Sequence, residues 1–377
     1  MARRLLPLIL ILGTGAVVAV AVWALTERYE RDQALATAFD RLRLFHDLRQ
    51  AALEDYLRST ASDVRAASEN LRVVEAMEKL DLGWRSCGPD ARKLLPRLYI
   101  DDNPDPAGQK GRLADAGDGC LYSQYHRNFH DWARRFLNHF GYYDAFLINP
   151  SGDIVYTVAK EIDFATNLKS GPYQKSPLAE VYRRAMASPA AEVDFSDFAR
   201  YPPSGDEPAA FAGHAILKNG KAIGVFAVQI PAEPLNELMH FTAGMGATGE
   251  TYLVGEDGLM RSQSRFISSP TLLETKVDNA SVREGIEGKR GAHVVRDYRG
   301  IPVLSVYAPV DFGGQKWVLL SEIDRAEVSE PRSRWIAIAM GAITGLISIG
   351  LVLAWRLGRY RNSDQARRSR ADNFLQG

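Results

Sequence analysis

Two long stretches without a charged residue, one near each end of the chain, constrain its fold more than any other feature. Leu5 to Leu25 and Trp335 to Trp355 each hold 21 residues, and neither contains Asp, Glu, Lys, Arg or His. A helix of this length rises about 30 Å, which is the thickness of the hydrocarbon core of a bilayer. The sequence therefore predicts two transmembrane helices, with residues 26–334 between them.

The charge of the short ends predicts the orientation of these helices. Residues 1–4 and 356–377 carry eight arginines against two aspartates, whereas the whole chain sums to zero. Because short basic flanks stay in the cytoplasm, we expect an inner (plasma) membrane protein of two spans, with both termini cytoplasmic and residues 26–334 periplasmic or extracellular. A cleaved signal peptide is the alternative for residues 5–25, but Val22-Trp-Ala-Leu25 offers no small-x-small cleavage site. The middle segment has no basic excess, so nucleic acid is not an expected partner.

The second apolar stretch carries small residues at intervals of four. On a membrane helix such a row lets another backbone approach closely, which favours helix pairing. Glycine is also common in membrane helices without any such role, and this alternative stays open. The row consists of Ala337, Gly341 and Gly345.

A long helical pattern follows the first apolar stretch. Apolar or small residues recur at steps of three and four from Leu35 to Val74, and neither Gly nor Pro occurs in residues 26–82. This periodicity is typical of one helix face. We expect residues 26–82 to form a stalk helix along which the other parts pack.

The remaining middle segment contains an internal repeat. Residues 146–155 resemble residues 252–261 at an offset of 106, and both have the pattern of a strand, a glycine turn and a second strand. Each repeat is followed by a second hairpin, with turns at Asn219-Gly220 and Gly313-Gly314. The sequence predicts an α/β (α+β) protein with two antiparallel-sheet units in tandem.

In this order, and over about residues 30–330, several motifs resemble the double Cache family. Its members are extracytoplasmic sensor domains of bacterial chemoreceptors, histidine kinases and cyclases. The resemblance implies two PAS-like units, a membrane-distal one at 83–234 and a membrane-proximal one at 235–330, and a role in signal transduction such as chemotaxis. The motifs are Tyr122-x-x-Tyr-His-x-x-Phe and the segments 140–148, 155–168, 249–262 and 298–309.

The resemblance also implies a small-molecule pocket in the distal unit, between the sheet and its inserted loops. Amino-acid-binding members carry an Arg followed by a Trp-Tyr pair, whereas Lys169-Ser-Gly-Pro-Tyr-Gln has neither the Arg nor the Trp. The expected ligand is a small polar metabolite, and this departure counts against an α-amino acid. Alternatively, the charged candidates form a solvated strand end and the tyrosines belong to the core. The candidate ligand-binding residues are Tyr156, Lys160, Asp163, Tyr173, Tyr182 and Asp197.

Two further groups of residues carry chemistry. Cys87 and Cys120 are expected to form a disulfide that closes a loop of about 33 residues, with two unpaired thiols as the alternative. His126 and His130 lie four residues apart near Cys120 and Asp131, which is a metal-ligand spacing. A solvated histidine pair is the preferred interpretation, so we expect no metal and no cofactor.

The sequence has no nucleophile elbow, zinc-protease or phosphate-loop motif, so we expect no catalytic residues and no enzyme. The favoured function is a sensor that relays ligand binding through its membrane helices. Because residues 356–377 contain no kinase, cyclase or methylation region, the expected partner is a separate signalling protein, a second copy in a homodimer, or both. The alternatives are an accessory subunit that uses the fold for protein contact and a truncated receptor without its output domain.

Overall fold

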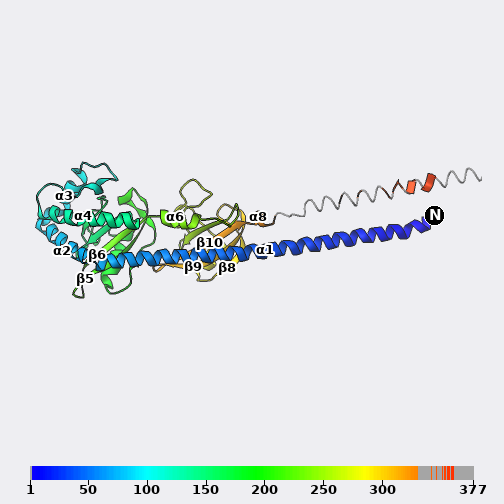
Figure 1. Ribbon diagram of the computed structural model, residues 1–377, viewed down its shortest axis with the longest axis horizontal. Helices are drawn as coiled ribbons and strands as arrows, with labels where there is room; N and C mark the ends of the chain where they lie inside the picture. Colours follow the sequence, from blue (N-terminus) through cyan, green and yellow to red (C-terminus); the bar gives the residue numbers. More distant parts are fainter. Residues whose placement is uncertain are drawn as a thin grey trace, which may run out of the picture. The chain divides into compact units, whose positions relative to one another are not determined.

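The computed structural model describes residues 2–329, with side chains for residues 18 and 20–328, and ten positions beyond them: 341, 345, 350, 352–353, 355–356 and 358–360. The chain divides into one unit of residues 1–38 and 328–377 and a second, compact unit of residues 39–327, which carries the sheets (Figure 1). Within the described residues, no helix is both long and apolar enough to cross a membrane. Ala337 lies outside them, and Gly341 and Gly345 are described only as helical.

The expected stalk helix is interrupted once. Helix α1 (Ala2–Glu69) ends before Asn70, and α2 (Leu71–Ser86) begins after it. Asn70 has an extended backbone (φ −66°, ψ 127°), and its side-chain oxygen accepts a hydrogen bond from the amide of Arg72. The prediction of one helix over 26–82 is therefore wrong at this position, because an asparagine N-cap starts a new helix there.

Short helical pieces and a long loop connect α2 to the first sheet. They comprise the 3₁₀ turns Gly88–Asp90 and Lys110–Arg112, helix α3 (Ala91–Pro96) and a π turn, Arg97–Asp101. Helix α4 (Leu121–Phe140) follows and ends at Gly141, whose φ of 78° only glycine adopts readily.

The first sheet is antiparallel, in the order β2-β1-β6-β5-β3, with β4 also paired to β5. The turn between β5 and β6 is Asn219-Gly220, and both residues have positive φ, as the sequence predicts. The strands are β1 (Asp144–Ile148), β2 (Ile154–Thr157), β3 (Asp194–Phe195), β4 (Ala199–Tyr201), β5 (Glu207–Lys218) and β6 (Lys221–Ile230); helix α5 (Pro177–Ala187) is inserted between β2 and β3.

The second sheet has the order β7-β10-β9-β8 and is also antiparallel. Gly313-Gly314 forms the turn between β9 and β10, again with positive φ at both positions. The repeat is not complete, because the segment after β7 makes only isolated bridges at Met260 and Leu259. The elements are α6 (Glu233–His240), β7 (Glu250–Gly255), α7 (Ala280–Ile286), β8 (Gly291–Arg296), β9 (Pro302–Phe312), β10 (Gln315–Asp324) and α8 (Arg325–Ser329).

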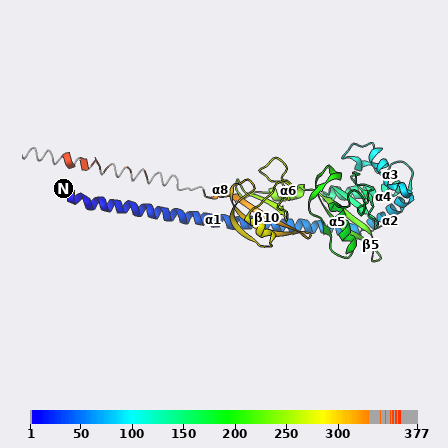
Figure 2. The same ribbon diagram turned by 180° about the vertical axis from the view of Figure 1, so that it is seen from behind.

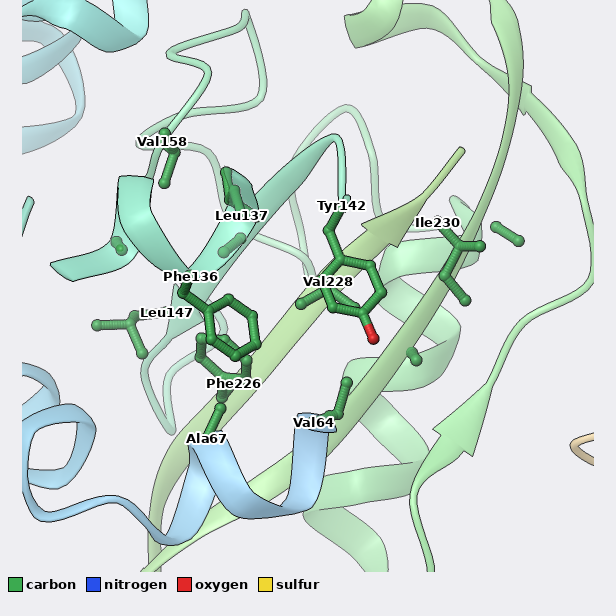
Figure 3. Close-up of a cluster of buried hydrophobic side chains, with 14 of the residues drawn as sticks. Val64, Ala67, Phe136, Leu137, Tyr142, Leu147, Val158, Phe226, Val228 and Ile230 are labelled. Carbon is green, nitrogen blue, oxygen red and sulfur yellow. The ribbon is translucent and has the colours of Figure 1, made fainter. Parts of the chain in front are cut away.

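Helices cover both faces of the first sheet. On one face, Val64 of α1 and Phe136 of α4 meet Phe226 and Val228 of β6 in a buried cluster (Figure 3). Helix α5 packs on the opposite face (Figure 2). Every residue of β1 and of the edge strand β2 is buried. Both faces of the sheet at these two strands therefore belong to the core.

Candidate functional site

Side chains fill the sheet face beneath α5, one of the segments inserted between the strands of the first sheet. Tyr182 is fully buried, and its hydroxyl donates to the carbonyls of Asn149 (3.2 Å) and Pro150 (3.0 Å). Tyr173 packs, half-buried, against the same cluster. Both tyrosines thus belong to the core, which was the alternative interpretation. The cluster consists of Phe146, Ile148, Ile154, Leu168, Leu178, Ala179, Val181, Tyr182, Ala185, Tyr201, Ala209, Phe211, Val225 and Ala227.

Asp197 joins the two sheet units. Its carboxylate accepts two hydrogen bonds from the Arg261 guanidinium (2.8 and 2.9 Å) and one from the indole of Trp317 (3.0 Å). The Arg261 side chain is only 4% exposed and also pairs with Asp257. The partners of Asp197 thus belong to the second sheet unit, and its contact with a ligand stays a prediction.

Lys160 is the most unusual of the predicted residues. It is 1% exposed, its φ of 60° lies in the left-handed region, and its Nζ donates to the carbonyl of Thr157. The Nζ atom also lies 4.5 Å from the ring centre of Tyr156 and 5.2 Å from that of Phe164, which is within range of cation–π attraction. A strained, buried lysine of this kind is often found at functional sites. It is not the solvated strand end of the alternative interpretation.

Two buried carboxylates accompany Lys160. The Asp144 Oδ1 atom accepts from the backbone amides of Val158 (2.8 Å) and Ala159 (2.9 Å), and Asp163 Oδ2 accepts from the hydroxyl of Tyr201 (2.6 Å). Burial raises the pKa of both carboxyl groups, and burial lowers the pKa of Lys160 against the opposing pull of the two aspartates. Burial thus favours the uncharged form of all three groups, and the attraction between Lys160 and the aspartates opposes it.

The two histidines of α4 are buried beside this cluster instead of being solvated. His130 Nε2 lies 2.8 Å from the carbonyl of Gly111, which can only accept, so Nε2 carries the proton and Nδ1 accepts from the hydroxyl of Tyr156 (2.8 Å). His126 Nδ1 donates in the same way to the carbonyl of Ala114 (2.7 Å). Burial lowers the pKa of His130 to about 3, so its ring is neutral. The histidines thus fasten the loop before α4, and the described residues include no group of metal ligands.

A cleft of about 540 Å³ opens next to Lys160. Its walls are the loop 107–112, the C-terminal half of α4 and the segment 158–162, which continues from β2. Glu161 on this wall accepts from the hydroxyls of Tyr143 and Ser204, both at 2.6 Å. A concave site above a buried polar cluster is the usual setting for binding a small molecule.

The structure thus brings together three of the six predicted residues: Tyr156, Lys160 and Asp163 lie in or beside one polar cluster. Arg112 and Arg134 line the same cleft and the histidines lie beside it, and none of them was predicted as a site residue from the sequence. One signal was available, because His126, His130 and Arg134 recur every four residues and so share one stripe of α4.

Cys87 and Cys120 are half-buried free thiols in the structure, so the expected disulfide is not formed in it. The two thiols are nevertheless neighbours. Burial and the nearby Cys120 thiol together raise the pKa of Cys87 to about 11. Cys120 also caps α4, where its sulfur accepts from the amide of Ser123 (3.4 Å).

Several solved structures are similar to this chain. The ligand-binding domain of the Campylobacter jejuni chemoreceptor Tlp3 is 13% identical, with a TM-score of 0.46 over 80% of this chain and 95% of that chain. The ligand-binding domain of the Pseudomonas aeruginosa chemoreceptor PctB is 12% identical (TM-score 0.41; 80% and 98%). The sensor domain of the V. cholerae histidine kinase DctB is 10% identical (TM-score 0.44; 77% and 97%).

The sequence comparisons identify the family. No curated protein sequence matches the chain. A family model described as a Cache domain (dCache_1) matches residues 29–332, which include both sheets and most of the stalk helix. The chain therefore belongs to the double Cache family of sensor domains.

Proposed function

We propose that this chain is a membrane-anchored, extracytoplasmic sensor that binds a small polar ligand in its first sheet unit and relays binding to a separate partner. The cleft of about 540 Å³ beside the buried Lys160 carries this proposal. Family membership supports the sensing role. The two uncharged end stretches and their arginine-rich flanks support the anchoring and the orientation.

The contacts of residues 241–249 in the second sheet unit support the relay of ligand binding; we call this segment the joint. The segment 241–249 contacts α1, where the Arg49 guanidinium donates to the carbonyl of Phe241 (2.5 Å) and lies over its ring. The same segment contacts α8, where the carboxylate of Glu327 accepts from the amides of Ala247 and Thr248, both at 2.8 Å. One short segment thus contacts two helices: α1, whose residue range includes the first predicted membrane span, and α8, which precedes the second in sequence.

The sensing function is tested by screening the purified full chain for thermal stabilisation by a library of small metabolites. The matched control is Ala107→Trp, because Ala107 is exposed and lines the cleft, so a large side chain there fills the site without disturbing the core. A compound that raises the melting temperature of the parent chain but not of Ala107→Trp supports the proposal. Sensing is refuted if no compound stabilises either protein.

An accessory subunit is the second candidate function, and the packed α5 face favours it. The fourteen buried side chains of this cluster fill the space between the sheet and α5. Crosslinking in native membranes distinguishes the candidates when combined with the screen: a stoichiometric partner together with no stabilising compound supports the accessory subunit. Recovery of self-crosslinked chain alone contradicts a separate signalling partner.

A further inference from the structure

A histidine occupies a core position of α1 where the helical pattern favours an apolar side chain. His46 is 2% exposed and lies in a buried stripe of α1 between Leu42 and Leu53, which are 3% and 0% exposed. It lines a small pocket together with Val306 and Ala308 of β9, which are also buried. The imidazole ring is thus inserted between the stalk helix and the second sheet.

His46 is the least satisfied buried histidine in the described part of the chain. Both ring nitrogens are buried, and neither has a hydrogen-bond partner. By contrast, both nitrogens of His130 and of His214 have partners, and so does Nδ1 of His126. A neutral imidazole has one donor and one acceptor, so its burial without partners costs free energy. An exception of this kind requires an explanation.

The surroundings of His46 also oppose a positive charge on the ring. Burial lowers the pKa of His46 to about 4; Asp47 of α1 opposes this shift, and Arg290 before β8 adds to it. A protonated imidazole has two N–H donors, and the buried position supplies an acceptor to neither nitrogen. The ring can therefore take up a proton only if it leaves this position.

The other polar side chains near the ring satisfy one another. Arg43 of α1 pairs with Asp40 (2.9 Å). The hydroxyl of Tyr307 on β9 donates to Glu284 of α7 and lies 3.0 Å from Nε2 of His293 on β8. These groups hold each other in place and do not compensate a charge on the ring.

The pocket provides space for a ring that leaves its buried position. Its volume is about 280 Å³, and Gly291 and Ala308 contribute only small side chains to its walls. Asp47 lines the same pocket and is exposed. A protonated ring turned into the pocket can donate to water and to the carboxylate of Asp47, and neither bond is available at the buried position.

We infer that His46 is an acid-sensitive latch between α1 and the second sheet, which opens when the ring takes up a proton and leaves its place beside β9. This inference goes beyond the proposed ligand sensing, because the latch needs no ligand and lies in the other sheet unit. Strand β9 pairs with β10, and β10 leads into α8. An open latch therefore loosens α1 from the strands that precede the second predicted membrane span.

The direction of the effect follows from the lowered pKa. Above about pH 6.5, the ordinary value for histidine, both the buried and the released ring are neutral, so the latch is closed. As the pH falls from about 6.5 toward 4, the released ring binds a proton and the buried ring does not. The closed state is therefore lost progressively over this range.

The test is hydrogen exchange of the purified full chain at pH 7.5 and pH 5.5, with rates corrected for the intrinsic pH dependence of amide exchange. Peptides that cover residues 40–50 and 303–310 report on the latch, and peptides from β1 and β5 report on the first sheet. The variants are His46→Leu, which continues the apolar stripe, and His46→Gln, which keeps a neutral polar side chain. His139→Leu is the matched control, because His139 is an exposed histidine of α4.

In the parent chain, protection of the latch peptides should fall roughly tenfold between pH 7.5 and pH 5.5. This is the factor by which protonation favours a released histidine with a pKa near 6.5 over one held near 4. The loss should be less than about twofold in both His46 variants and should match the parent in His139→Leu. Titration of Glu284 and His293 is common to all four proteins and cancels in this comparison. Circular dichroism at pH 7.5 checks that the variants fold.

Three results would overturn the inference. Unchanged protection of the latch peptides in the parent chain would show that the ring keeps its buried position in acid. An equal loss in the parent and in both His46 variants would assign the pH response to other groups. An equal loss in the latch peptides and in those of β1 and β5 would indicate unfolding of the whole unit and not the opening of a latch.

Discussion

The hydroxyl of Tyr156 donates a 2.8 Å hydrogen bond to Nδ1 of His130, and Nε2 of the same ring donates to the carbonyl of Gly111. A single buried imidazole therefore connects the edge strand β2 to the loop that forms one wall of the cleft. The first prediction tests this connection.

Replacing His130 by Ala should lower the free energy of unfolding by about 2–4 kcal/mol, because two buried hydrogen bonds and the ring volume are lost. Urea denaturation measures this loss, and limited proteolysis should show faster cleavage within residues 102–119. His139→Ala is the control, since His139 lies on the same helix but is exposed. Equal losses in the two variants would show that His130 has no special role.

The second prediction concerns pH. Burial raises the pKa of Glu322 to about 8, and Glu250 and Asp297 nearby add to the shift. Between about pH 4.5 and 8 the folded state holds this proton while the unfolded state has released it, so the stability contributed by the protonated group is lost as pH rises. Glu322→Gln, which still offers an acceptor to Tyr252, should be more stable than the parent chain at pH 8 and should reduce this dependence.

The measurement is the unfolding free energy at several pH values from 5 to 8.5. Glu256→Gln serves as the control, because Glu256 is an exposed residue of the same sheet unit. A parent chain whose stability rises over this range in a way that Glu322→Gln abolishes would contradict the prediction.

The third prediction concerns the contact between the sheet units. Asp197→Asn removes the negative charge that faces the buried Arg261. Among the described residues, this leaves Asp257 as the ion-pair partner of Arg261. We expect a loss of roughly 2–3 kcal/mol, because breaking a buried pair leaves an uncompensated charge. Asp278→Asn, which breaks the exposed pair with Arg283, should cost less than about 1 kcal/mol. Similar losses in both variants would mean that the buried pair contributes little.

The fourth prediction concerns the joint at segment 241–249. Glu327→Gln weakens the charge-assisted hydrogen bonds from the amides of Ala247 and Thr248. Hydrogen exchange of these two amides should accelerate, while ligand binding in the distant cleft stays unchanged. Glu237→Gln in the exposed part of α6 is the control. Unaltered exchange in Glu327→Gln would show that the carboxylate does not hold the joint closed.

The fifth prediction concerns the cysteines. The high pKa of Cys87, caused by burial and by the Cys120 thiol, keeps its thiolate scarce, so mild oxidation should form the Cys87–Cys120 disulfide slowly at pH 7 and faster at pH 9. The bond should add about 3–4 kcal/mol of stability by closing the loop. Thiol titration and intact mass follow the reaction. A chain that retains two free thiols after prolonged oxidation would contradict the prediction.

Much of the architecture was predictable from sequence because its signals are local. Asn219-Gly220 and Gly313-Gly314 form turns since both require positive φ, which Asn and Gly tolerate. Helix α4 ends at Gly141 for the same reason, because the backbone there has a positive φ that glycine tolerates. The break at Asn70 was missed, because helical periodicity continues across it and only the side-chain cap interrupts the helix.

The site was less predictable for a different physical reason. β2 is buried on both faces, so its sequence has no alternation that shows which side Tyr156 and its neighbours point to. The left-handed backbone of Lys160 also has no sequence signal, since a lysine rarely adopts it. The partners of Asp197 lie 64 and 120 residues away in sequence, and only tertiary packing brings them together.

The packed face beneath α5 has a consequence for protein engineering. Truncating the fully buried Phe211 to Ala would leave an apolar void between Phe146 and Tyr201, whose rings now contact it. Engineered voids of this kind stay dry and accept small apolar molecules. The substitution would thus create a second binding cavity by design. The same protein would then bind a synthetic hydrocarbon on a face of the sheet separate from the cleft beside α4.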